Sequence, residues 1–198
     1  MSGTYTIEYS SSRRDETKEE IREARKACSF VEKVFNKAYR KLIRYLKKHG
    51  GFDNEPNNYY DDNLNIIVRI DKENLDHYGG AFCPDDNIIV INKYVMPISS
   101  KSCESINLFK NKKSLEHILI HELIHYAFTE YTYGKGKKPK SWVVGLCSPE
   151  DMHKSVEKGF DKIWGLDEWL DEALTEYLAM NISGKLRKNA LLHEENIS

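Results

Sequence analysis

The chain has 198 residues, which is the length of one domain with a buried hydrophobic core. Its 30 lysines and arginines balance 31 aspartates and glutamates, and a formal net charge of −1 supplies no overall field for nucleic acid or an anionic membrane. The four scattered cysteines form no Cys-x-x-Cys pair, which favours a reducing compartment. Because we find no secretory signal pattern and no run of about 20 apolar residues, we expect a cytoplasmic protein with no membrane or nucleic-acid partner.

The first part of the chain predicts a loose start followed by one long helix. Residues 1–15 are polar and rich in serine, which is typical of a flexible terminus. Over residues 16–49, apolar side chains recur in steps of three and four, which predicts a helix with one buried face. We expect this face to pack on the sheet of the same domain, and a coiled-coil seam is the alternative. The face consists of Ile21, Ala24, Cys28, Val31, Phe35, Ala38, Leu42 and Tyr45.

Two β-branched runs at residues 65–70 and 87–92 predict strands that are neighbours in a sheet. Residues 78–84 lie between them and contain two glycines and a proline. This composition allows an edge strand but not a central one. An edge strand beside a cleft can pair with an extended peptide, and an ordinary surface hairpin is the alternative.

The second half of the chain predicts three helices, at residues 114–131, 148–164 and 167–183. Ser114 is a suitable N-cap for the first of them. A basic, glycine-containing loop at 134–140 follows it, and this loop is either simply solvated or guides an acidic substrate. Residues 184–198 form a charged tail. We therefore place one domain at residues 16–183.

The sequence His121-Glu122-Leu123-Ile124-His125 contains the arrangement His-Glu-x-x-His. On an α-helix, a spacing of four places both imidazoles on one face, where two neutral nitrogens can bind one metal ion. Glu122 is rotated by about 100° from His121, so its carboxylate reaches a water molecule at the metal rather than the metal itself. The alternative is a helix whose histidines are satisfied by hydrogen bonds in a core. His117 lies one turn before His121 and extends the same face; we interpret it as a structural residue that packs in the core, and a supporting position behind the metal ligands is the alternative.

A catalytic zinc ion has three protein ligands and one position open to water, so two histidines are not sufficient. The chain must supply a third ligand downstream of the motif. The candidates are Glu168, Asp171, Glu172 and Glu176 on the last helix, and His153.

The run from Trp169 to Tyr177, WLDEALTEY, resembles the second motif of the gluzincin metallopeptidases, the thermolysin-like and aminopeptidase-like group. The resemblance implies an α+β zincin-like domain with a small mixed sheet, an active-site helix and a downstream glutamate helix. It also implies that Glu172 is the third zinc ligand and that Glu176 accepts a hydrogen bond from the second nitrogen of a ligand histidine. The chain differs from the common pattern at Asp171 and Ala173, where the group has Asn and Gly.

The 47 residues from His125 to Glu172 exceed the spacing in thermolysin and are closer to that in the anthrax lethal factor-like metallopeptidases. That group also has its ligand and helper residue four apart. A shift of one turn therefore leaves Glu168 as the alternative ligand to Glu172.

Together, the two motifs predict a Zn²⁺-dependent metallopeptidase that hydrolyses a peptide or protein substrate. His121, His125 and Glu172 are the predicted metal ligands, and Glu122 is the predicted general base. We expect a narrow specificity, because unrestricted proteolysis would harm a cytosol. The alternative is a non-catalytic binding protein that keeps the zincin scaffold and a structural zinc. The candidate donors to the oxyanion of the reaction are His153, Tyr131, Tyr133 and Tyr177.

Overall fold

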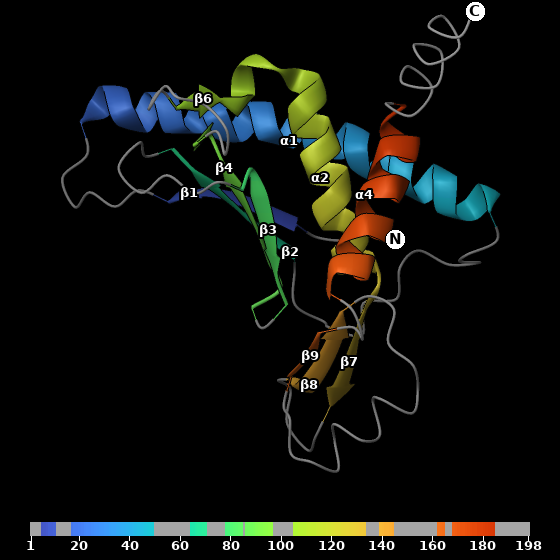
Figure 1. The fold of residues 1–198 in the computed structure, drawn as a ribbon. Coiled ribbons are helices and arrows are strands. Elements are labelled where there is room, and N and C mark those ends of the chain that lie inside the picture. Colours follow the sequence, from blue (N-terminus) through green and yellow to red (C-terminus); the bar gives the residue numbers. More distant parts are fainter. Residues whose placement is uncertain are drawn as a thin grey trace, which may run out of the picture.

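The computed structural model describes residues 5–10, 17–49, 64–70, 78–84, 86–96, 105–133, 139–144, 162–164 and 168–184, and the side chains among these except at 130–144, 162–164 and 168–170. Helices and a mixed sheet together form an α+β fold (Figure 1). Within these residues, no helix has both the length and the apolar character that spanning a membrane requires.

Helix α1 (Lys18–Lys48) is the longest element and runs across one face of the main sheet (Figure 1). Thr17 begins it with a capping box. Its hydroxyl accepts a hydrogen bond from the Glu20 amide, and the Glu20 carboxylate accepts one from the Thr17 amide. The predicted periodic face is confirmed for most of its residues and packs inside the domain against β1, β2 and α2. Ile21, Cys28 and Tyr45 are only half-buried. The buried residues of α1 are Ala24, Ala27, Val31, Val34, Phe35, Ala38, Leu42 and Leu46.

The main sheet has the strand order β1-β2-β4-β3. Strands β1 (Tyr5–Ser10), β2 (Leu64–Arg69) and β4 (Ile88–Asn92) are parallel, and β3 (Gly80–Cys83) is antiparallel to β4. The two predicted strands are thus confirmed as neighbours. The glycine-containing segment between them supplies an edge strand, as its composition allowed.

The predicted loose start is wrong for residues 5–10. Tyr5, Ile7 and Tyr9 are half-buried and alternate with exposed polar residues, and this period of two is that of a strand with one covered face. The ring of Tyr5 packs on Phe35 of α1, with 4.8 Å between the ring centroids. The alternation is short and lies among serines and threonines, so it carries little signal in the sequence alone.

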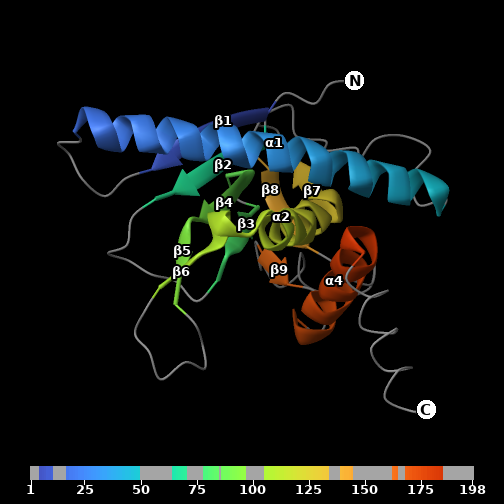
Figure 2. The same cartoon turned by 90° about the horizontal axis from the view of Figure 1, so that it is seen from above.

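Helix α2 (Lys112–Ala127) is buried on most of its surface, because α1, β3 and α4 all pack against it. Its N-cap is Asn111 and not Ser114 as predicted. The Asn111 side chain accepts hydrogen bonds from the amides of Lys113 and Ser114. Figure 2 shows α2 between the main sheet and α4.

Helix α2 ends four residues earlier than predicted, and strand β7 (Thr129–Tyr133) follows it. The Thr129 hydroxyl donates to the carbonyl of His125 at 2.6 Å, which satisfies one of the free carbonyls at the helix end. Strand β7 pairs with β8 (Pro139–Val144), which pairs with β9 (Lys162–Trp164) in a second sheet.

The predicted helix at 148–164 is therefore wrong in its last turn, where β9 stands, and residues 148–161 lie outside the described residues. The last helix is confirmed as α4 (Glu168–Ser183), which packs on α2. The remaining short elements are β5 (Tyr94–Val95), β6 (Ile106–Asn107) and the 3₁₀ helix η1 (Leu108–Lys110). Most of the predicted tail, 185–198, also lies outside the described residues.

Candidate metal centre

Helices α2 and α4 face each other with histidines on one helix and acidic residues on the other. His117 and His121 of α2 both contact Glu176 of α4, whereas His121 and His125 both contact Glu172. Residues four apart lie on one face of a helix, and the contacts follow the two helices in opposite order. The helices are thus antiparallel here, and each turn of α2 meets one turn of α4.

The side chains of His121, His125 and Glu172 meet at one point. The Nε2 atoms of the two histidines are 3.1 Å apart. The Glu172 carboxylate lies 3.1 Å from Nε2 of His121 through Oε2 and 3.2 Å from Nε2 of His125 through Oε1. One ligand atom from each of the three residues lies within 4.8 Å of the other two, so this group could hold a metal ion.

The distances in this cluster fit a bound cation. Around a tetrahedral ion with ligand bonds of about 2.0–2.1 Å, neighbouring ligand atoms are about 3.3 Å apart. The observed 3.1–3.2 Å is close to this value. In addition, two unprotonated Nε2 atoms at this distance would direct their lone pairs at each other, which is unfavourable unless a proton or a metal ion lies between them. The donor set of two histidines and one glutamate is one that catalytic zinc uses.

Each of the two histidines has a further carboxylate behind it. Oε2 of Glu176 lies 3.2 Å from Nδ1 of His121, as the resemblance implied. Oδ2 of Asp171 lies 3.5 Å from Nδ1 of His125, at ion-pair distance but without hydrogen-bond geometry. From the sequence, Asp171 was a candidate third ligand and the residue in place of the common Asn, and its position behind His125 was not predicted. Carboxylates in these places favour the proton on Nδ1, which leaves the Nε2 lone pair for a metal.

The carboxylates give the cluster a strong affinity for positive charge. Burial acts to lower the pKa of His125, but Asp171 and Glu172 outweigh it and raise that pKa to about 9. Burial likewise opposes the rise in the pKa of His121, which Glu172 and Glu122 cause. Hydrogen bonds from both histidines hold the pKa of Glu172 well below its usual range. A cation that displaces these protons would benefit from the same field.

Glu122 lies beside the cluster and is only 6% exposed. A Cβ added at Gly80 of β3 would be 3.1 Å from both Cγ and Oε1 of Glu122, so the carboxylate lies directly against the edge strand. Burial raises the pKa of Glu122, while His121, His125 and a hydrogen bond from the Phe82 amide act in the opposite direction. A buried carboxylate with a raised pKa is suited to accepting and returning a proton.

Solvent reaches the cluster from the side of α4. The side chain of Glu172 is 51% exposed and that of His121 is 18% exposed. Among the other candidates, Tyr177 is exposed on α4. The side chains of Glu168, Tyr131 and Tyr133 and the whole of His153 lie outside the described residues.

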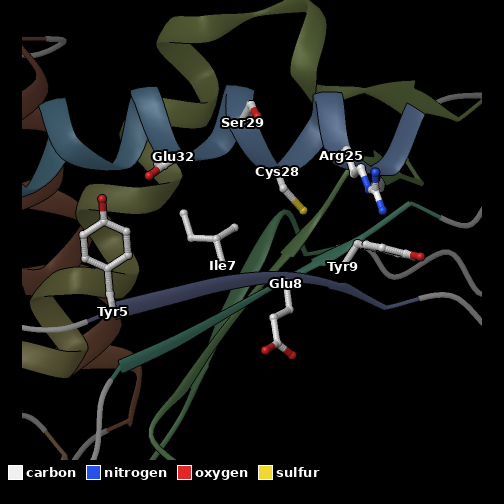
Figure 3. Close-up of a pocket in the computed structure, with 8 residues that line it drawn as sticks. All are labelled: Tyr5, Ile7, Glu8, Tyr9, Arg25, Cys28, Ser29 and Glu32. Carbon is white, nitrogen blue, oxygen red and sulfur yellow. The ribbon is translucent and has the colours of Figure 1, made fainter. Parts of the chain in front are cut away.

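A separate hollow of about 810 Å³ lies between β1 and α1 (Figure 3). Ile7 and Cys28 face each other across it, whereas Glu8 points to the other side of β1. None of the histidines or carboxylates of the cluster lines this hollow, so it has no part in the candidate centre.

Comparisons of the chain with protein-family models, curated proteins and solved structures found no match. The residues and geometry of the centre itself must therefore indicate what the protein does.

Proposed function

We propose that the protein is a zinc metallopeptidase of gluzincin type, in which His121, His125 and Glu172 hold the metal and Glu122 is the general base. The observation that carries the proposal is that the three ligand side chains converge within 4.8 Å beside a buried glutamate that belongs to the same helix turn as the histidines. We also propose that the sheet, the helix with the histidines and the helix with Glu172 together form a zincin-like domain.

The residues of the chain have separate tasks in the reaction. When bound, zinc would supply a Lewis acid for the scissile carbonyl and an acidified water molecule. Glu122 takes a proton from the attacking water and returns it to the nitrogen of the leaving amine, a role typically worth about 10²–10⁴-fold in rate. Glu176 and Asp171 hold the imidazoles of His121 and His125 with their Nε2 atoms towards the metal.

The edge strand β3 supplies a place for an extended substrate. The Asn92 amide donates to the Gly79 carbonyl at 3.0 Å, and the register pairs Gly80 with Ile91. In an antiparallel pair, every second residue hydrogen-bonds to the partner strand, so the backbone groups of Gly80 and Phe82 point away from β4. The Phe82 amide donates to Glu122 there, so a substrate strand would pair with the Gly80 groups and the Phe82 carbonyl. A peptide that pairs there would lie next to Glu122.

The exposure of the centre favours catalysis over a purely structural zinc. A structural zinc site is usually closed by four protein ligands. Among the described residues, three side chains form the group of possible ligands, and one of them, Glu172, is half-exposed. A scaffold protein with a structural zinc is the competing interpretation.

The replacement Glu122→Gln separates these functions. The variant keeps the size of the side chain and leaves the three ligands in place, so we expect zinc content equal to that of the natural protein and a loss of turnover of about 10²–10⁴-fold. Metal analysis and a peptide-library digest followed by mass spectrometry measure the two quantities. Glu172→Gln is the matched control and should lose both zinc and turnover. A zinc-loaded natural protein that cleaves nothing, or no better than Glu122→Gln, would overturn the proposal.

A further inference from the structure

The carboxylate of Glu176 lies between two histidines of α2. Besides the contact with His121, its Oε1 and Oε2 atoms are 2.9 Å and 3.0 Å from Nε2 of His117. His117 is only 6% exposed. Its other ring nitrogen, Nδ1, is 3.3 Å from the Ser183 hydroxyl in the last turn of α4. His117 thus bridges two turns of α4.

The possible donors and acceptors fix the positions of two ring protons in this group. An ionised carboxylate only accepts hydrogen bonds, so His117 must donate through Nε2–H to Glu176. His121 must likewise donate through Nδ1–H to the same carboxylate. Without metal, Nε2 of His121 also donates to Glu172; once a metal ion displaced that proton, the Nε2 lone pair would point at the candidate metal position.

We propose that His117 is a positioning residue of the metal centre, which fixes the Glu176 carboxylate so that Glu176 can orient His121 as a metal ligand. This inference rests on the proposed metal site. It assigns a role in that site to a histidine that lies outside the His-Glu-x-x-His motif.

Glu176 needs such a support, because its side chain is 42% exposed and has several rotatable bonds. Its hydrogen-bond distance of 3.2 Å to His121 is long for a charge-assisted pair, whereas both contacts with His117 are shorter. His117 and His121 lie one turn apart on the same buried helix. Their spacing is therefore set by the helix, and together they hold the carboxylate in a single orientation.

The test compares His117→Leu, which removes both hydrogen bonds and keeps an apolar volume, with His117→Gln, whose amide can still donate to Glu176. Zinc affinity is measured by competition with a chelator, on folded protein well below its unfolding temperature. Loss of a partner behind a ligand typically reduces metal affinity by 10–100-fold, and we expect about 10-fold for His117→Leu because it acts through one intermediate residue. We expect His117→Gln to restore most of the affinity.

A double-mutant cycle then distinguishes positioning from general stability. In a Glu176→Ala background, His117→Leu should cause no further loss of zinc affinity, because the residue through which it acts is gone. The Co²⁺ absorption spectrum of His117→Leu should also change, whereas a change in stability alone would leave it as in the natural protein. Unchanged zinc affinity in His117→Leu, or an equal loss in both backgrounds, would refute the inference. If the natural protein binds no zinc, the proposed function itself fails. If it binds zinc and His117→Leu binds zinc equally well, only the role of His117 is refuted.

Discussion

Replacement of Gly80 by alanine tests whether the position of Glu122 controls turnover. The added Cβ would lie 2.8 Å from Cγ2 of Ile118 and 3.1 Å from Cγ and Oε1 of Glu122. The first distance is below normal contact, and the two distances to Glu122 are tight. Ile118, Glu122 or the strand itself must move by several tenths of an ångström, and no histidine or Glu172 atom is among the three nearest contacts.

The expected loss follows from this displacement. Overpacking of this kind costs about 1–3 kcal/mol of stability. A misplacement of about 1 Å can reduce the rate of an enzyme by about 10²-fold, so the smaller shift predicted for Gly80→Ala should reduce kcat by about 10-fold. Because the ligand side chains keep their places, we expect zinc affinity within about 2-fold of the natural value. Peptide cleavage under saturating substrate and chelator competition measure the two effects.

Gly79→Ala is a matched control from the adjacent position. Its Cβ would come within 2.6 Å of Cδ1 of Ile118 and 2.9 Å of Cδ1 of Leu108, with no atom of Glu122 among these nearest contacts. It should therefore cost similar stability while kcat stays near the natural value. Equal turnover in the two variants, after correction for the folded fraction, would show that contact with Glu122 does not govern the reaction.

Two further predictions concern protons and charge. His125 has a pKa of about 9 without metal, so it is protonated at pH 7. Zinc binding should therefore release at least one proton, and the zinc affinity should increase as the pH rises towards 9. Calorimetry in buffers of different ionisation enthalpy counts the released protons, and Asp171→Asn should reduce their number. Burial acts to raise the pKa of Glu116, but ion pairs with Lys37 and Lys41 outweigh it and lower that pKa. The ionised Glu116 carboxylate therefore stabilises the fold at pH values above the pKa of the unfolded state, and this contribution is lost as the pH falls through the lowered pKa of the folded state. At pH 7, Glu116→Gln should reduce the free energy of unfolding by about 1–2 kcal/mol. This difference, measured by urea unfolding, should shrink below about pH 4; a difference that is constant with pH would contradict the assignment.

The elements that the sequence predicted well are those with a long or pure pattern. The face of α1 repeats over about six turns, from Ala24 to Leu46, and β2 and β4 each contain a run of three or four β-branched residues. β1 was missed because its stability comes from parallel pairing with β2, far along the chain, which no local pattern reports. The end of α2 was missed because Thr129 and the residues after it favour a strand, and this preference outweighed the helical pattern that precedes them.

The candidate site was predictable where one helix supplies the geometry. A spacing of four within α2 places His121 and His125 together, and this needs no knowledge of the tertiary fold. The contacts of His117 and Asp171 depend instead on how α4 lies against α2. Only the antiparallel register of the two helices brings His117 opposite Glu176 and Asp171 opposite His125.

The charges of the centre favour a divalent cation as the natural occupant. Four carboxylates lie near three imidazoles within one partly buried region. The carboxylates are those of Glu122, Asp171, Glu172 and Glu176, and the imidazoles are those of His117, His121 and His125. Without metal, this excess of negative charge is offset by protons, which is why the pKa of His125 rises to about 9. One divalent ion would replace the protons at the Nε2 atoms of His121 and His125 and would leave Glu122 beside the ion, where the Phe82 amide donates to its carboxylate. The carboxylates that favour protonated histidines in the free protein would also favour a bound metal ion. Protons and a metal ion therefore compete for the Nε2 atoms of His121 and His125.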